Sequence, residues 1–211
     1  PELRGDRLVR FGIDAKYAAL SHAYVREVAT KIGDLIGQTA ERLEPCKLIY
    51  SHARAGFAMN RRLPTSGGFI NSPNPDGPVD HDAPVLRVEN ADGQLRAILF
   101  GYACHPTTLS FMKWCGDYPG FAQLELERKY PGVTAMFVNT CGGDQNPLPR
   151  RKVELCRKYG HLLAVAVDEA LKKELRTISP EIKTAFDYVD LEYTKVVSRE
   201  DLMLASQSAN A

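Results

Sequence analysis

Polar residues follow two hydrophobic segments of this sequence that have the character of buried strands. His105 comes shortly after the strand predicted over Leu95–Ala103, and the proline after it stops the strand. The second predicted strand, Val133–Asn139, runs into a tight turn around Gly142-Gly143. Ligands of open α/β sheets bind beyond the strand ends, where loops converge. These two strand ends are therefore the places in the sequence where chemistry is expected.

His105 is the best metal-ligand candidate among the histidines. An imidazole at a strand end can bind zinc through one ring nitrogen while a hydrogen-bond acceptor holds the other. The alternative is a structural histidine that makes hydrogen bonds only, and that role is the more common one. Position alone leaves both interpretations open.

The turn after the second strand offers backbone chemistry. Gly142-Gly143 allows close approach and could present amide N–H groups to a developing oxyanion, but the turn lacks the pattern of a phosphate-binding loop. Asp117 and Asp144 lie in glycine-flanked turns. Either carboxylate could orient a histidine, although fixing its own loop is the commoner use.

Nucleophilic chemistry has weaker support. Cys104 precedes His105 directly, and neighbours on a strand point to opposite faces, which disfavours a Cys–His dyad. The five cysteines include no C-x-x-C pair, so no zinc knuckle or thioredoxin-type motif is indicated. No G-x-S-x-G nucleophile elbow is present.

The composition excludes some partners. Hydrophobic residues make up 44% and charged residues 25% of the 211 residues, and the formal net charge is +1, so no nucleic-acid partner is expected. No window is long and apolar enough for a transmembrane helix. The chain starts at Pro1 without an initiator methionine or a signal-like segment, and we expect it to be part of a larger catalytic domain.

The elements that must position these residues follow from periodicity and turn signals. We predict an α/β layered domain, partial and single over 1–211, in which helices flank a mixed β-sheet. The stretch 55–82, rich in Gly, Pro and Asn, is predicted to be a long loop. The predicted helices are Ala15–Leu43, Tyr118–Tyr130 and Arg151–Leu175, and the predicted strands are Lys47–Ser51, Pro84–Val88, Leu95–Ala103, Val133–Asn139 and Ile182–Val196.

Five segments are informative as an ordered set: Asn60-Arg61, Asp82–Leu99, Cys104–Thr108, Gly116–Ala122 and Val138–Pro147. In this order they resemble the neutral ceramidase family. The first helix begins where the family has its first long helix, and the resemblance continues to the helix at Arg151. Each motif is short, but five in the same order are more specific. Asn60-Arg61 is similar to the family's Asn-Arg motif, Asp82–Leu99 to the lead-in to its histidine, Cys104–Thr108 to V-H-[GS]-T-S, Gly116–Ala122 to D-N-K-G-Y-A, and Val138–Pro147 to the strand and loop ending in G-[DN]-x-S-P-N.

The resemblance implies hydrolysis of an amide bond by zinc-activated water. His105 would be a zinc ligand, Arg61 would bind substrate oxygen or transition-state charge, and Asn146 with Gly143 would form a polar wall beside the carbonyl. The family's other ligands, a histidine before Pro1 and a downstream Glu and Tyr, are expected outside this chain. The implied substrate is N-acylsphingosine or a related small-molecule or lipid amide, with peripheral membrane contact and a secreted or periplasmic location.

One departure from the family pattern bears on mechanism. The family's serine maps to Asn146, and the Asn after Pro maps to Leu148. Asparagine cannot form an acyl-enzyme, whereas zinc-bound water needs no serine. The change places ceramide itself in question. Two alternatives follow: a ceramidase-like domain that serves in binding or assembly without catalysis, and a cysteine-dependent hydrolase using Cys104 or Cys141.

Overall fold

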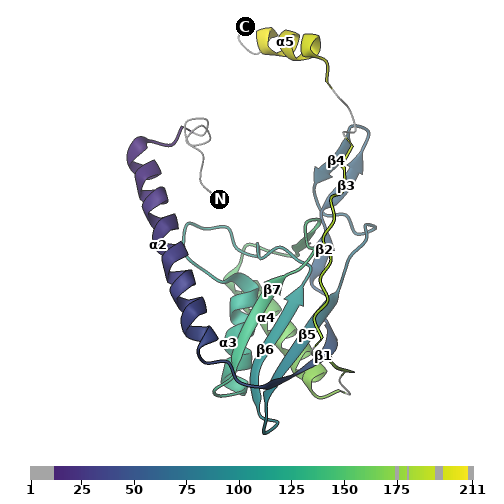
Figure 1. Ribbon diagram of the computed structural model, residues 1–211. Helices are drawn as coiled ribbons and strands as arrows, with labels where there is room; N and C mark the ends of the chain where they lie inside the picture. Colours follow the sequence, from purple (N-terminus) through teal and green to yellow (C-terminus); the bar gives the residue numbers. More distant parts are fainter. Residues whose placement is uncertain (1–11, 174–175, 180, 193–196, 209–211) are drawn as a thin grey trace. The chain divides into compact units, whose positions relative to one another are not determined.

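A five-stranded sheet organises the computed structural model, which describes residues 12–173, 176–179, 181–192 and 197–208 (Figure 1). The strand order is β7-β6-β5-β1-β9. Strand β7 runs parallel to β6 while the other pairs are antiparallel, so the predicted mixed sheet is confirmed. The strands are β1 (Cys46–Arg54), β5 (Asp82–Asn90), β6 (Leu95–Tyr102), β7 (Thr134–Asn139) and β9 (Arg176–Thr177).

The hairpin that joins β5 to β6 forms where the turn residues predict it. Gly93 adopts a positive φ of 77°, and its N–H donates to the Asn90 carbonyl oxygen at 3.0 Å. A residue with a Cβ is strained in this backbone region, whereas glycine is not. The turn therefore sets the register of the two central strands, with Val85 opposite Phe100.

Two helices, α3 (Asp117–Lys129) and α4 (Val153–Leu171), pack against each other and against the sheet (Figure 1). Alternate residues of the strands, such as Val85, Ile98 and Phe100, turn toward these helices and are buried. Along much of the strands every second residue is buried, and so is one side of helix α4. These two buried surfaces face each other and form the core. The predicted α/β layered fold is confirmed.

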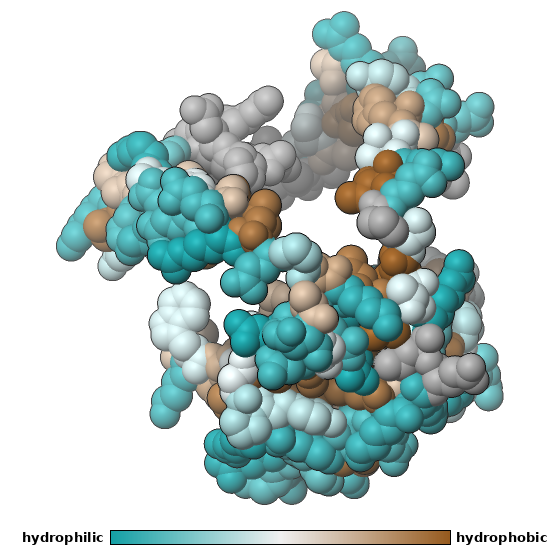
Figure 2. Space-filling view, turned by 60° about the horizontal axis from the view of Figure 1, so that its bottom comes forward, coloured by the Kyte–Doolittle hydropathy of each residue, from teal (hydrophilic) through white to brown (hydrophobic). Residues whose placement is uncertain are grey.

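Helix α2 (Ala15–Ala40) forms close to its predicted range, and the Asp14 side chain caps it by accepting from the Lys16 N–H at 2.6 Å. Its apolar stripe is not buried. Tyr24 and Leu35 are 64% and 63% exposed, and hydrophobic residues reach the surface of the chain in Figure 2. The sheet face opposite to α3 and α4 is also open, with Val138 46% exposed.

The segment predicted as a loop over 55–82 contains three short strands. β3 (Arg62–Thr65) and β4 (Gly68–Asn71) form a small hairpin. β2 (Ala58–Asn60) pairs with β8 (Gln145–Pro147), which lies more than eighty residues later in the sequence. Local composition cannot reveal such a distant pairing. Its consequence is functional, because it places Met59 opposite Asn146.

The chain divides into two compact units, Pro1–Ile178 and Ser179–Ala211, where the sequence predicts one domain. In the second unit α5 (Arg199–Ser208) begins after Ser198, whose hydroxyl oxygen accepts from the Asp201 N–H at 3.1 Å. The strand predicted over 182–196 is wrong for 182–192, and 193–196 lie outside the described residues. Among the described helices none could span a membrane.

A buried carboxylate fastens α4 to α3. Asp168 accepts from the Tyr130 hydroxyl at 2.5 Å, from Lys129 at 2.8 Å and from Lys172 at 2.5 Å. Burial alone would raise the pKa of Asp168, but the hydrogen bonds from Lys129, Lys172 and Tyr130 outweigh it and lower the pKa to about 2. The ionised carboxylate is thus a stabilising link between the two helices.

The Asp168→Asn variant is expected to lose about 1.5–3 kcal/mol of unfolding free energy at neutral pH, the usual range for a charged hydrogen bond. Because the folded-state pKa lies below the unfolded value of about 3.9, this stabilisation is present above pH ~4 and is lost as the pH falls toward 2. Urea unfolding at several pH values measures it. Asp92→Asn, in an exposed turn, is the matched control, and equal acid sensitivity of the wild type and Asp168→Asn would contradict the assignment.

Candidate active site

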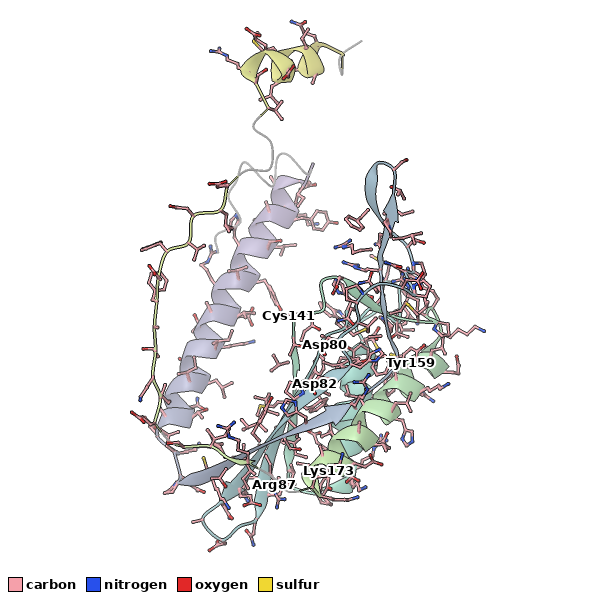
Figure 3. All side chains as sticks on the ribbon, turned by 90° about the vertical axis from the view of Figure 1, so that its right-hand side faces the viewer. Asp80, Asp82, Arg87, Cys141, Tyr159 and Lys173 are labelled. Atoms are coloured by element: carbon pink, nitrogen blue, oxygen red, sulfur yellow. The ribbon has the colours of Figure 1, made fainter. Side chains whose placement is uncertain are left out.

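An aromatic cluster lies beneath the strand ends that the sequence singled out. Phe57 contacts the rings of Tyr102, Tyr118 and Tyr159 at centroid distances of 4.8, 5.0 and 4.7 Å. The rings come from β6, α3 and α4 and from the segment before β2; Tyr159 is labelled on α4 in Figure 3. The cluster therefore joins β6, which leads to His105, and the segment that leads to Arg61 to helices α3 and α4.

The three tyrosine hydroxyls tie backbone segments to this cluster. Each O–H donates to a carbonyl oxygen of a segment that leads into the site. The acceptors are Ala55 for Tyr102 at 2.6 Å, Cys104 for Tyr118 at 2.6 Å, and Pro149 for Tyr159 at 2.5 Å. A buried carbonyl is costly unless it is paired, so these bonds restrict where the loops can lie.

His105 is held at the end of β6 by the loop after β7. Its Nδ1 lies 2.7 Å from the Gly142 carbonyl oxygen, and its backbone N–H donates to Gln145 at 3.0 Å. A carbonyl oxygen can only accept, so we assign the proton to Nδ1. Nε2 then carries a lone pair and has no partner among the described residues. This is the arrangement that a metal-binding imidazole needs.

Gly142 is required for this contact. A Cβ at this position would lie 2.5 Å from the Cys104 nitrogen and 2.7 Å from the Ala103 carbonyl carbon. Both are backbone atoms, so the loop could not approach the strand end as closely with any other residue. The Gly142 N–H is itself used, donating to Thr140 at 2.7 Å, and is therefore not free to bind an oxyanion.

The next two amides of this loop are free. The Gly143 and Asp144 N–H groups have no acceptor in the part of the chain that the structure describes. Their carbonyls are held instead: the Arg61 Nε and Nη2 atoms donate to the Gly143 oxygen at 3.1 and 3.0 Å, and the Arg61 N–H donates to the Asp144 oxygen at 2.7 Å. Arg62 Nη2 adds a bond to Gly143 at 3.2 Å. The structure thus brings Arg61 and Gly143 together, with Arg61 as a loop-holding donor.

Asn146 is buried in β8 with 5% of its surface exposed. Its Oδ1 atom accepts from the Thr107 hydroxyl at 3.3 Å, which links it to the segment just after His105. With Oδ1 engaged in this way, the side-chain NH₂ group is the polar group left to face the neighbouring hollow. His105, Arg61, Gly143 and Asn146 therefore lie on strand β8 and the loop segments that adjoin it.

Asp117 serves the loop that precedes α3. Its carboxylate accepts from the backbone N–H groups of Leu109 at 2.9 Å and Tyr118 at 2.7 Å. It is 6% exposed and adopts a positive φ of 51°. The loop-fixing interpretation of this residue therefore fits the structure, and the same bonds help to place the Tyr118 anchor.

The two cysteines considered as nucleophiles differ in environment. Cys104 is buried, and burial raises the pKa of its thiol to about 12. Because the thiolate is the nucleophile, a thiol in this state is a poor candidate. Cys141 is exposed and lies at the same end of the sheet as Asp80, while Lys173 lies toward the opposite end (Figure 3).

Zinc would need more ligands than this site offers. Within the described residues no group of three or more His, Cys, Asp or Glu side chains could hold a metal ion. A catalytic zinc takes about three protein ligands and keeps one position open. His105 fits one ligand position, with its second nitrogen correctly held, and the described residues do not complete the set.

Sequence reasoning missed two features of the site. Tyr118 and Tyr159 lie on helical stripes, where an anchoring tyrosine cannot be told from an ordinary core residue. Arg150 lines the hollow beside Asn146 and was not singled out. Its signal was the run Arg150-Arg151-Lys152 at the start of a predicted helix, where basic residues are unfavourable.

Comparison with known proteins found similarity in structure only. No protein-family model and no curated protein sequence matches the chain. The neutral ceramidase from Pseudomonas aeruginosa matches with a TM-score of 0.56 and 21% identity, over 69% of this chain and 26% of that one. A ceramidase complexed with C2 matches with a TM-score of 0.54 and 19% identity, over 65% and 24%.

The chain has a ceramidase-like fold. It spans about a quarter of the length of these two structures. The likeness covers roughly two thirds of this chain and agrees with the resemblance found in its motifs. At this level of identity it shows the fold alone.

The two glycines of the turn provide a direct test of the site geometry. Gly142→Ala is expected to destabilise the protein by about 1–3 kcal/mol, because the added methyl group meets fixed backbone atoms. Gly143→Ala is the matched control, since a Cβ there meets nothing within 4 Å. Urea unfolding of both variants measures the difference, and equal loss from the two substitutions would show that the close approach is not required.

Proposed function

We propose that this chain supplies one wall of the active site of a zinc-dependent amidohydrolase that cleaves an N-acyl amide with metal-activated water. The observation that carries the proposal is the His105 imidazole, whose Nδ1 is held by the Gly142 carbonyl at 2.7 Å while Nε2 is left unpaired. The ceramidase-like fold supports it.

His105 is the proposed zinc ligand, and the remaining ligands are expected from residues outside this chain. The metal, when bound, supplies an activated water and polarises the substrate carbonyl. The chain's own contribution is orientation. The Gly142 carbonyl keeps the His105 proton on Nδ1, so that Nε2 can only act as a donor of its lone pair.

The loop that holds His105 also presents hydrogen-bond donors. The free Gly143 and Asp144 N–H groups are adjacent in the backbone, an arrangement that favours negative charge. Arg61 and Arg62 pull the Gly143 carbonyl to their side, and in a trans peptide the Asp144 N–H then points the opposite way. These donors would stabilise the oxyanion that forms when water attacks the amide carbonyl.

Asn146 has a supporting role in this proposal. Its Oδ1 is engaged by Thr107, so its NH₂ group is available to the substrate. It cannot provide an acyl-enzyme, and the nucleophile is therefore water. The same residue favours the second candidate function, a ceramidase-like domain that binds an amide without cleaving it.

Metal analysis of the full-length protein tests the proposal. The wild type is expected to contain about one zinc per molecule, and His105→Ala should lower zinc affinity by more than the roughly 10- to 100-fold typical of removing a residue that merely supports a ligand. His161→Ala is the control, because this histidine lies on α4 and pairs with Glu125 at 2.7 Å.

Three outcomes separate the candidates. Stoichiometric zinc that is unchanged by His105→Ala would remove His105 from the metal site. Amide hydrolysis that is insensitive to chelators would reject the zinc mechanism altogether. A protein that binds N-acyl amides but has neither zinc nor hydrolytic activity would be the binding domain.

A further inference from the structure

A small hollow opens beside Asn146. It is lined by β2, β4, β8 and the segment before α4, with a volume of about 30 Å³. One water needs about 10–15 Å³ by the same measure, so the hollow fits one small polar group and no hydrocarbon chain. Among the described residues that line it, Arg61 and Arg150 are the charged ones and none is acidic.

Arg150 is a cation without an acceptor. It is half-buried, and its guanidinium makes no hydrogen bond or ion pair within the described part of the chain. A guanidinium carries five N–H donors, so the unmet bonding capacity is large. Burial, followed by the like charges of Arg151 and Arg61, lowers the pKa of Arg150. Nothing among the described residues offsets this repulsion.

The backbone adds positive potential at the same place. The run Arg150-Arg151-Lys152 leads directly into α4, whose first residue is Val153. Lys152 is the N-cap residue and gives no side-chain cap, and Glu154 in the first turn offsets the positive end of the helix dipole only in part. Cations at a helix N-terminus are unfavourable, and an anion bound beside Arg150 would relieve its repulsion from Arg151 and Arg61.

We infer that this hollow binds a carboxylate group of the substrate, close to the amide that is cleaved. The inference rests on the proposed function and adds the substrate class: an N-acyl amide whose amine part carries a carboxylate, as an N-acyl amino acid does. Asn146 connects the two places, since it lines the hollow and is bonded to Thr107 just after His105. The compact hollow and the planar guanidinium of Arg150 match a carboxylate.

A matched pair of ligands tests the inference by binding alone. N-octanoylglycine and N-octanoylglycinamide have the same shape and differ in the charge of one end. We expect the full-length protein to bind the acid about 10- to 100-fold more tightly in calorimetry, as one charge-assisted contact implies. Arg150→Gln should reduce this preference to near one, and Arg150→Lys should keep part of it because the charge remains but the planar fork is lost.

Arg96→Gln is the control, because Arg96 is exposed on β6 and does not line the hollow. Circular dichroism checks that each variant folds. If Arg150→Gln does not fold, the wild type alone still tests the inference. Its preference for the acid over the amide should fall when salt is added, because salt screens the charge interaction. Equal affinity for acid and amide, or a preference that Arg150→Gln leaves unchanged, overturns the inference.

Hydrolysis of the two ligands is measured separately from their binding. A preference for the acid that depends on Arg150, without cleavage of either compound, supports the carboxylate site and rejects the proposed hydrolase. Cleavage of both compounds with the same KM keeps the hydrolase and rejects the carboxylate site. The failure of one proposal can therefore be told from the failure of the other.

Discussion

The candidate site depends on three buried tyrosine hydroxyls that donate to backbone carbonyls. Tyr102, Tyr118 and Tyr159 surround Phe57, and each holds one segment that leads to the site. Leaving such a buried carbonyl unpaired would cost about 1–3 kcal/mol of folding free energy, so each hydrogen bond stabilises the observed position of its loop. Segments that are far apart in the sequence are thereby positioned by one aromatic cluster, and the site inherits the rigidity of the core.

The hydrogen bonds from the tyrosine hydroxyls allow several positive charges to lie close together at one end of the sheet. Arg61 and Arg62 share the Gly143 carbonyl, and Arg150 lies near Arg61 without a counter-ion among the described residues. Loops held only by solvent-exposed contacts would move apart to reduce the repulsion. Here the Tyr159 bond to Pro149 and the β2–β8 pairing keep the arginines close. An anion that binds beside Arg150 would relieve its repulsion from Arg61, and this relief would favour binding.

The sequence predicted what local patterns determine. The β5–β6 hairpin and helices α3 and α4 depend on periodicity and turn chemistry, and they form close to their predicted ranges. The pairing of β2 with β8 depends on residues that are distant in sequence. Arg150 lines a hollow together with residues of these two strands, so its role could not be predicted without that pairing. Alternation over 182–192 failed because a strand needs a partner edge, and the described structure provides none there.

All but one of the polar groups described as free in the site are hydrogen-bond donors. The Gly143 N–H, the Asn146 NH₂ group and the Arg150 guanidinium are all donors, whereas His105 Nε2 is an acceptor without a partner among the described residues. A serine at position 146 would bring a hydroxyl that can donate or attack, whereas the Asn146 side chain accepts from Thr107 through Oδ1 and offers its NH₂ group as a donor. Donors of this kind stabilise negative charge and do not attack a carbonyl. In the proposed hydrolysis the nucleophile would therefore come from solvent, and the free lone pair on His105 Nε2 marks where a metal would activate it.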